Sequence, residues 1–289
     1  MWNDMNVGML YGFISTLLNA ISYFRPQIIV VSFDSRQKTF RHELFPQYKA
    51  QRSKTPDDFF QQIPLVKEAL RAFEIEYLSR AGYEADDIIG TVAKKLETED
   101  FRVKILSGDL DFTQIVNDHI KLIKISGKIE QSPVYGKKEV EARFGVFPQQ
   151  MIDFKAISGD ASDNYKGVPG LGPKAASELL RKYKTLENIL ANLEELPQKI
   201  REKLELARES VLNFQKLAKL DLFSPIEDLR VEDFHFCKEK TLPFFDKFNF
   251  KNLENRYIKL IKQFEQNKNI EQKNRTKKSN NNNQTILFL

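Results

Sequence analysis

The stretch QIIVVSFDS, residues Gln27–Ser35, is a nearly continuous apolar run that leads directly into Asp34. Unbroken apolar runs of this length are typical of parallel strands that are buried on both faces of a sheet. Phe101–Leu106 (FRVKIL) is a second predicted strand, and helices are predicted over Phe59–Phe73 and after Gly82. This alternation predicts an α/β domain with a mostly parallel sheet flanked by helices.

The second half of the chain has a different character. After about Met151 no strand is predicted, and helices are expected over Lys174–Tyr183, Thr185–Leu193 and Pro197–Leu220. From about Gln266 the sequence is polar and lacks aromatic residues, which predicts a disordered linker ahead of the apolar end TILFL. The predicted organisation is an α/β domain at 1–156 with a basic segment at 40–60, a helical region at 157–265, a linker at 266–283 and a terminal peptide at 284–289.

Composition limits the classes of function. The 289 residues are 41% hydrophobic, enough for a core, and no apolar run is long enough to span a membrane. One cysteine, Cys237, suits a reducing cytoplasm, where we expect a monomer. The 45 Lys and Arg against 40 Asp and Glu give a net charge of +5, which is compatible with a polyanionic partner.

Acidic residues gather in four segments, three of which follow predicted extended segments. The carboxyl ends of parallel strands meet at one edge of a sheet, so side chains placed there converge. Each acid alone could instead be a helix cap or a turn residue, as in the helix start GYEADDIIG. The candidates are Asp34, Glu84, Asp86, Asp87, Asp109, Asp111, Asp160 and Asp163.

Carboxylates that converge repel one another unless cations neutralise them. Oxygen ligands without histidine or cysteine suit Mg²⁺ or Mn²⁺. The three histidines, His42, His119 and His235, lie outside the acidic segments. Two such ions would activate a water and stabilise the leaving oxygen in phosphodiester cleavage, so the sequence predicts a site for two divalent ions.

A basic segment with interleaved aromatic residues, FRHELFPQYKAQRSK, follows Asp34. It is either a solvated basic face anchored by its aromatic side chains, or a grip on a phosphate beside the ions. In the second interpretation the aromatic rings would stack on a frayed base. The candidate residues are Arg41, Tyr48, Lys49, Arg52 and Lys54.

A glycine-rich turn, GVPGLG, follows Asp163 and leads into a predicted helix that includes Lys174. Exposed amides at the start of a helix bind a phosphate without reading a base. The pattern, which contains Gly167, Gly170 and Gly172, predicts a helix-hairpin-helix motif for sequence-independent DNA binding. A turn of this kind can also merely join two helices.

Over roughly Gly8–Leu260 the chain resembles the 5′-3′ exonuclease family. This family includes the amino-terminal domain of bacterial DNA polymerase I, stand-alone bacterial relatives, phage exonucleases and, more distantly, flap endonucleases. The segments VVSFDS, FRHELFPQYKAQR, GYEADD, LSGDLDF and SGDASDNYKGVPGLGPK occur in the family's order and spacing. The resemblance implies a PIN or flap-endonuclease-like fold that hydrolyses DNA at a 5′ end, nick or 5′ flap, in replication and repair.

The resemblance also implies roles for single positions. The eight acids fall on the family's metal-site positions, and Lys49 and Arg52 fall on a basic pair of an arch beneath which single-stranded 5′ flaps pass. The GVPGLG hairpin falls on the element that binds duplex DNA and holds K⁺ through backbone carbonyls.

One departure concerns the start of the chain. The family begins with a strand that ends in an aspartate, whereas MWNDMNV has no apolar run before the helix GMLYGFISTLLNAI. We therefore expect the sheet to lack a central strand and the first ion to lack a ligand, through a late start or a truncation. The alternative function is a structure-selective DNA-binding protein with impaired catalysis, while a phosphatase of small substrates fits the hairpin poorly.

The last residues, Gln284–Leu289 (QTILFL), resemble the short peptide by which bacterial replication and repair proteins bind the sliding clamp. Apolar residues after a polar linker would bury nothing within the chain and would be open to a partner. The predicted contacts are Gln284, Leu287 and Phe288, and an accidental apolar terminus is the alternative.

Overall fold

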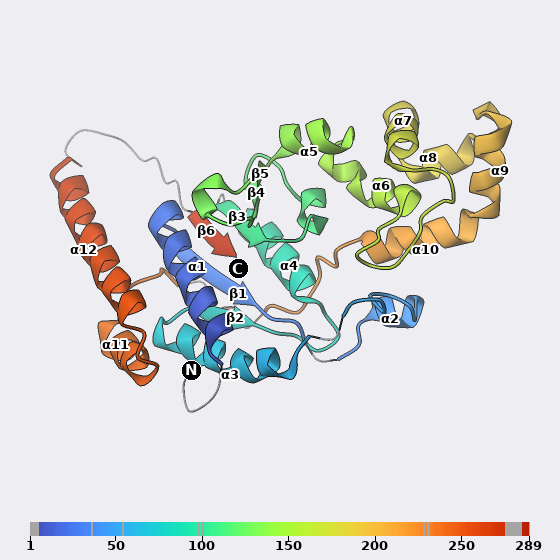
Figure 1. Cartoon of the computed structure of the whole chain (residues 1–289). Helices are drawn as coiled ribbons and strands as arrows, with labels where there is room; N and C mark the ends of the chain where they lie inside the picture. Colours follow the sequence, from blue (N-terminus) through green and yellow to red (C-terminus); the bar gives the residue numbers. More distant parts are fainter. Residues whose placement is uncertain are drawn as a thin grey trace.

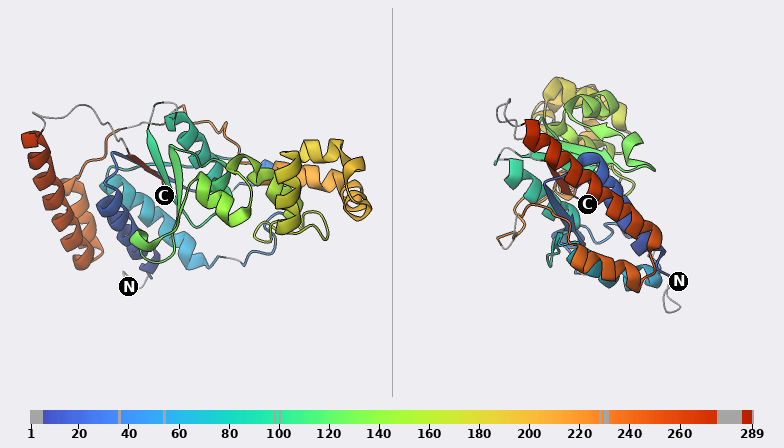
Figure 2. Two further views of the ribbon diagram at one scale, coloured as in Figure 1. Left: turned by 90° about the horizontal axis from the view of Figure 1, so that it is seen from above. Right: turned by 90° about the vertical axis from the view of Figure 1, so that its left-hand side faces the viewer.

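The computed structural model describes residues 6–274, except 36, 54, 98, 100, 228, 230 and 231, together with 285–288. For 267–274 and 285–288 only the backbone is described. A sheet lies near the middle of an elongated molecule, with helices on both of its faces and a helical region at one end (Figures 1 and 2). None of the described helices is long and apolar enough to cross a membrane.

The sheet has the order β2-β1-β6-β3-β4-β5 among the described residues, and all neighbours are parallel except β4 and β5. The α/β class and the parallel sheet predicted from the sequence are confirmed. The unbroken apolar runs are explained by burial, because alternate residues of β1 face different cores on the two sides of the sheet. The strands are β1 Ile28–Ser32, β2 Glu76–Leu78, β3 Arg102–Ser107, β4 Ile120–Lys124, β5 Val134–Tyr135 and β6 Thr285–Phe288.

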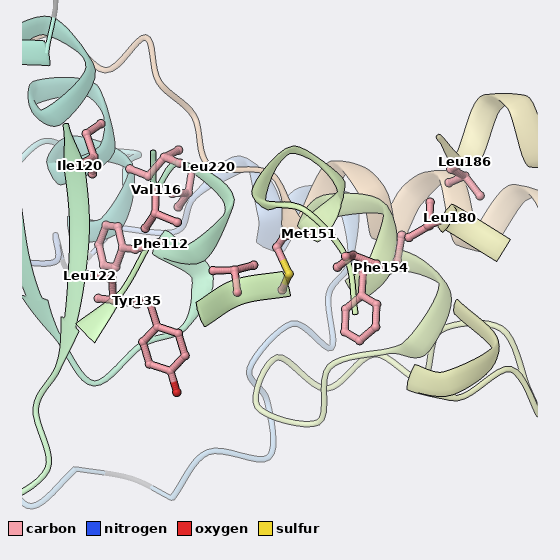
Figure 3. Packing of buried hydrophobic residues seen from close by; sticks show 14 of the residues in the cluster. Phe112, Val116, Ile120, Leu122, Tyr135, Met151, Phe154, Leu180, Leu186 and Leu220 are labelled. Atoms are coloured by element: carbon pink, nitrogen blue, oxygen red, sulfur yellow. The ribbon is translucent and has the colours of Figure 1, made fainter. Parts of the chain in front are cut away.

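Helices cover both faces of the sheet. On one face α4 (Ala85–Glu97) packs in a core that continues into the helical region through Phe112, Met151 and Phe154 (Figure 3). The other face is covered by α1 (Gly8–Phe24), α3 (Asp57–Ala72), α11 (Lys238–Lys247) and α12 (Lys251–Asn274).

The helical region contains a short hairpin between α6 and α7. Its helices are α5 Lys137–Phe144, α6 Met151–Ser158, α7 Pro173–Tyr183, α8 Leu186–Ala191, α9 Gln198–Leu206 and α10 Arg208–Ala218. The short helix α2 (Phe40–Leu44) packs against α10. Short 3₁₀ turns lie at η1 Asp111–Gln114, η2 Ile129–Gln131, η3 Pro148–Gln150 and η4 Leu193–Glu195. The helix predicted over Pro197–Leu220 is two helices, with a break at Ala207.

The predicted domain limits need correction at the carboxyl-terminal side. Helices α11 and α12 pack on the sheet beside α1 and α3, so the segment predicted as one helical region at 157–265 is divided between two parts of the molecule. Helix α12 also continues to Asn274, which makes the first residues of the predicted linker helical. The rest of that linker, 275–283, lies outside the described residues.

The centre of the sheet is not vacant, contrary to the expectation from the sequence. Strand β6 lies between β1 and β3 and pairs with both of them in parallel. Its backbone is part of the sheet, so the premise that the terminal peptide is open to a partner does not hold in this structure. Gln284 and Leu289, the residues on either side of β6, lie outside the described residues.

Candidate metal and phosphate site

The carboxyl edge of the sheet brings together acids from separate segments. Asp34 lies just beyond β1, and Asp109 lies just beyond β3. The Oδ1 atom of Asp34 accepts a hydrogen bond of 2.8 Å from the amide of Ala85, the first residue of α4. This bond joins the end of β1 to GYEADD, so two of the predicted acidic segments meet at one point.

Asp86, in the first turn of α4, lies within electrostatic range of several other carboxylates. Burial is the main cause that raises the pKa of Asp86 to about 7, and Asp109 is the next. The charges of Asp34 and Glu84 also raise it, whereas Lys49 lowers it. A cation bound beside Asp86 would offset both its burial and the repulsion from the neighbouring carboxylates, and would favour its ionised form.

Asp87 has a different role from its neighbour, and its predicted place among the metal ligands is wrong. Its carboxylate is buried and accepts hydrogen bonds of 2.8 and 2.7 Å from the Arg41 guanidinium. The amides of Glu84 and Asp221 donate to the same carboxylate at 3.2 and 2.8 Å. These donors occupy both oxygen atoms, so Asp87 holds α4 in place and presents no free face to an ion.

Arg41 is likewise not a DNA contact. Its side chain is 3% exposed, and it also donates to the carbonyl oxygens of Leu217 and Lys219 at the end of α10. Burial alone would lower the pKa of Arg41, but Asp87 outweighs this effect and holds the guanidinium charged. Arg41 thus ties α2 to α4 and α10, and the predicted contact with DNA is wrong because the guanidinium does not reach solvent.

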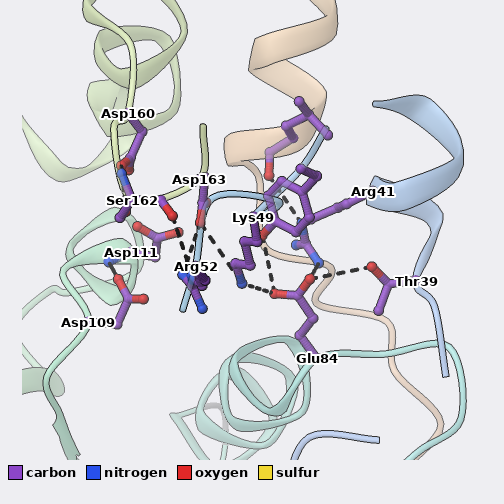
Figure 4. Close-up of polar contacts among 12 residues, drawn as sticks. Thr39, Arg41, Lys49, Arg52, Glu84, Asp109, Asp111, Asp160, Ser162 and Asp163 are labelled. Carbon is purple, nitrogen blue, oxygen red and sulfur yellow. Dashed lines mark hydrogen bonds and ion pairs between the residues drawn. The ribbon is translucent and has the colours of Figure 1, made fainter. Parts of the chain in front are cut away.

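Glu84 is the acid around which the basic segment is organised (Figure 4). The Nζ atom of Lys49 lies 2.6 Å from Oε2 of Glu84, and Thr39 donates to Oε1 at 3.3 Å. Lys49 has a positive φ of 55°, a conformation that is uncommon for a residue with a side chain. The turn at Lys49 therefore directs its ammonium group to the acidic edge of the sheet.

Tyr48 was predicted to stack on a base, and the structure corrects this too. The ring is 4% exposed and packs with Tyr165 and Leu217, while its hydroxyl donates to Glu84 at 3.3 Å. Burial is the main cause that raises its pKa above the ordinary value, with Glu84 next. Tyr48 therefore anchors the basic segment through its buried ring. This is the role that the first interpretation of the segment gives to its aromatic side chains. Lys54 lies outside the described residues.

Asp163 receives the second cation of the basic segment. The Nη2 atom of Arg52 lies 3.2 Å from Oδ1 of Asp163, and the Nζ atom of Lys49 lies 4.0 Å from the same oxygen. Asp163 is buried, which raises its pKa, and Lys49 partly opposes that increase. The basic segment is thereby joined to the loop that begins the hairpin.

Lys155, on α6, connects the two remaining acidic segments. Its ammonium group contacts Oδ1 of Asp111, and it lies 2.7 Å from Oδ2 of Asp160. Burial opposes ionisation of Asp160, but Lys155 and Ser162 outweigh it and hold the pKa of Asp160 below its ordinary value. Sequence reasoning missed Lys155, although its place in DFKAISGD, shortly before Asp160, was the available signal.

The chemistry of these side chains fits a divalent cation, although their positions in this structure do not form a complete binding site. The ligands are all carboxylates, and the pKa of Asp86 is raised first by burial and then by the charge of Asp109. Within the part of the chain that the structure describes, no three Asp, Glu, His or Cys side chains are arranged to hold one ion. Lys49, Arg52 and Lys155 pair with the acids instead, so a bound cation would have to replace some of these ion pairs.

The hairpin between α6 and α7 is closed by two glycines. A Cβ atom on Gly167 would lie 2.3 Å from the Gly159 amide nitrogen and 2.4 Å from the Ile157 carbonyl oxygen, and both glycines have positive φ. Gly167 is buried, so it shapes the hairpin and its predicted contact with DNA is wrong. Gly170 and Gly172 are exposed ahead of α7, and their contacts with DNA stay a prediction.

A groove of about 730 Å³ connects the acids to the hairpin. Its lining includes Asp109, just beyond β3, Asp160, just beyond α6, and Lys174, in the first turn of α7. Arg143 and Lys155 add positive charge to its wall. The groove therefore has both acidic and basic side chains in its wall, together with residues from the first turn of α7.

Fold and site together define a resolvase-like α/β domain, with an acidic edge, joined to a helical domain. The family model described as 5′-3′ exonuclease, N-terminal resolvase-like domain, matches residues 2–145. The model described as 5′-3′ exonuclease, C-terminal SAM fold, matches residues 146–241. The chain belongs to the 5′-3′ exonuclease family.

Similar proteins include a stand-alone enzyme and parts of polymerases. The 5′-3′ exonuclease of Aquifex aeolicus (strain VF5) is 39% identical over 237 residues, which cover 80% of this chain and 80% of that protein. DNA polymerase I of Bacillus caldotenax is 38% identical over 256 residues, which cover 86% of this chain and 29% of the polymerase. The chain thus spans less than a third of the length of the polymerase relatives that it matches.

Solved structures share the fold. The T5 5′-exonuclease with bound zinc ions has a TM-score of 0.64 at 21% identity, over 90% of this chain and 92% of that chain. The catalytic core of Rad2 in complex with a DNA substrate has a TM-score of 0.57 at 18% identity, over 86% of this chain and 84% of that chain.

Proposed function

We propose that this protein is a divalent-metal-dependent nuclease that hydrolyses DNA phosphodiesters at or near a 5′ end, nick or 5′ flap. The observation that carries the proposal is the convergence of acids at the carboxyl edge of the sheet, beside Lys49 and Arg52. Membership of the 5′-3′ exonuclease family supports it, as does the similar exonuclease of Aquifex aeolicus. The setting would be replication and repair in the bacterial cytoplasm, at the nucleoid.

The proposed metal ligands are the predicted acids other than Asp87. Asp34, Asp86 and Asp109 would hold one cation, while Glu84, Asp111, Asp160 and Asp163 would contribute directly or through water once their basic partners move. Mg²⁺ and Mn²⁺ suit these ligands, and two bound ions would activate a water and neutralise the leaving oxygen.

Lys49 and Arg52 would bind the scissile phosphate. Both cations form ion pairs with the acids. Lys49 is also partly exposed and Arg52 is half exposed, so a phosphate can reach them from solvent. A phosphate that approaches the edge of the sheet would draw them away from Glu84 and Asp163, leaving those carboxylates to the metal. We propose that substrate and metal binding support each other for this reason.

The hairpin would bind the duplex away from the cut. No side chain caps the amino terminus of α7 with a hydrogen bond, and Lys174 is exposed there. Phosphates of a duplex would lie on this helix end and follow the groove towards Asp109. We also propose that backbone carbonyls of the hairpin hold K⁺.

The rival function is a structure-selective DNA-binding protein without catalysis. It is favoured by the ion pairs of Lys155, which keep Asp111 and Asp160 occupied. Titration of the full chain with Mg²⁺ or Mn²⁺ on a labelled 5′ flap, a nicked duplex, an intact duplex and a small phosphate monoester distinguishes the two. Metal-dependent cleavage of the flap and the nick supports the nuclease, whereas tight flap binding with no cleavage at any metal concentration supports the rival.

We also propose contact with a sliding clamp, which requires the terminal strand to separate from the sheet. Thr285–Phe288 would have to leave the sheet, so clamp binding and strand pairing exclude each other. We propose micromolar binding of the terminal peptide, about −8 kcal/mol, through Gln284, Leu287 and Phe288. Calorimetry of a synthetic QTILFL peptide with the clamp, with those three positions changed to Ala as the control, tests this. Absence of heat up to millimolar peptide would reject it.

A further inference from the structure

Strand β6 is the connection between the two halves of the sheet. Ile286–Phe288 pair with Ile28–Val30 of β1 on one side, and Thr285–Phe288 pair with Arg102–Ile105 of β3 on the other. In the described sheet β1 pairs only with β2 and β6, and β3 only with β4 and β6. The pair β2-β1 and the group β3-β4-β5 are therefore joined through four residues from the far end of the chain.

The same strand lies between the sources of two acids. Asp34 follows β1 and Asp109 follows β3, so the two carboxylates come from opposite sides of β6. Neighbouring strands are about 4.8 Å apart, which places β1 and β3 about 10 Å apart across β6. Without an occupant, both strands would become open edges with unpaired amides and carbonyls, and nothing in the sheet would fix this separation.

The surroundings of the gap select an apolar occupant. Ile28 and Val30 of β1 belong to the core on one face, and Ile29 and Val31 belong to the core on the other. A strand in the gap thus has apolar β1 neighbours towards both faces of the sheet, and its charged register partners, Arg102 and Lys104, come from β3. The segment Thr285–Phe288 reads TILF and is uncharged, and the ten residues before it, 275–284, are polar throughout.

We propose that the gap between β1 and β3 is a strand-binding site whose occupant is the chain's own segment Thr285–Phe288. Main-chain hydrogen bonds on both sides hold this segment, as in recognition by strand addition. Its presence sets the separation of Asp34 and Asp109, so the end of the chain is a positioning element for the metal site.

Cross-linking tests the occupant directly. In a Cys237→Ser background, Lys104→Cys with Leu287→Cys joins register partners on adjacent strands, within the range of a disulfide. The control, Lys121→Cys with Leu287→Cys, uses the residue that pairs with Lys104 from β4, one strand further away. We expect an intramolecular disulfide in the first variant and none in the second. Equal cross-linking, no cross-linking, or cross-linking between two copies overturns the proposal.

A second measurement tests the effect on the metal site, and this part rests on the proposed function. Leu287→Pro removes a main-chain donor where a central strand does not accept proline, whereas Asn281→Pro makes the same change outside the strand. In the folded full chain we expect Leu287→Pro to weaken Mn²⁺ binding at least about tenfold, and Asn281→Pro to leave it unchanged. Equal Mn²⁺ affinities refute the positioning role. A chain that forms the cross-link but binds no Mn²⁺ in any form refutes the proposed function alone.

Discussion

Asp86 and Asp87 are adjacent in GYEADD, yet their surroundings differ. Asp86 lies among other carboxylates, whereas Asp87 pairs with Arg41. Replacing each by Asn distinguishes the proposed metal ligand from the structural ion pair. Burial and the charge of Asp109 raise the pKa of Asp86. Asp87 neutralises buried Arg41 through two hydrogen bonds. We therefore expect Asp86→Asn to stabilise the metal-free protein and abolish metal binding, and Asp87→Asn to destabilise the protein while leaving the metal ligands in place.

The magnitudes follow from the pKa of Asp86 and from the burial of the ion pair. A pKa of about 7 against an ordinary value of 3.8 corresponds to at most roughly 4 kcal/mol. Because the side chain of Asp86 keeps some contact with solvent, we expect a gain of about 2 kcal/mol at pH 8. Asp87→Asn leaves the buried guanidinium of Arg41 without its counter-charge, which costs about 3–5 kcal/mol.

The sign of the pH dependence follows from the same pKa. Between pH 3.8 and about 7 the folded protein binds a proton at Asp86 that the unfolded chain has released. The contribution of Asp86 to stability therefore falls as the pH rises through this range, and the penalty is complete above it. The difference in stability between Asp86→Asn and the unchanged protein should accordingly be largest at pH 8 and decline towards pH 4.

Urea unfolding in EDTA at pH 4 to 8 measures these stabilities, and Mn²⁺ titration followed by electron paramagnetic resonance measures metal binding. The reasoning is refuted if Asp86→Asn is the less stable protein at pH 8. It is also refuted if Asp87→Asn loses Mn²⁺ binding under conditions in which it remains folded.

Three further predictions concern the cations and the terminal strand. Lys49→Ala should lower the single-turnover rate of flap cleavage far more than flap affinity, because a cation next to developing charge acts mainly in the transition state; an effect on affinity alone would make Lys49 an ordinary phosphate contact. Lys155→Met should lower the melting temperature of the metal-free protein, because Asp111 and Asp160 lose their ion-pair partner. The same change should tighten Mn²⁺ binding, and calorimetry that shows weaker Mn²⁺ binding would contradict this. The disulfide between Lys104→Cys and Leu287→Cys should prevent binding to a sliding clamp until it is reduced, and clamp binding by the oxidised form would show that the strand need not leave the sheet.

The parts of the fold that the sequence predicts are those with strong local patterns. The apolar run of β1, the short strand pattern of β3 and the acids that follow them are each local in sequence, so both the parallel sheet and its acidic edge can be inferred. The start of α7 is predictable for the same reason, because GVPGLGPK combines turn glycines with a proline at the first helical position.

The errors come from contacts between residues that are far apart in sequence. Asp87 has the same local pattern as Asp86, and only the approach of Arg41 from another segment distinguishes them. The basic segment reads as exposed, yet Tyr48 is buried against α10. The apolar TILF is a plausible short strand, but its partners in β1 and β3 lie far earlier in the chain, and no local signal identifies them.

The measurement that tests the central claim most directly compares the full chain with its Asp109→Ala variant on a labelled 5′ flap. Asp109 follows β3, and its charge is the largest cause, after burial, of the raised pKa of Asp86. We predict cleavage by the unchanged chain that depends on Mg²⁺ and is stopped by EDTA. Loss of one ligand from a metal site that supplies several kcal/mol should lower the rate about a hundredfold or more, with flap affinity nearly unchanged. Cleavage by Asp109→Ala at the rate of the unchanged chain would contradict the account.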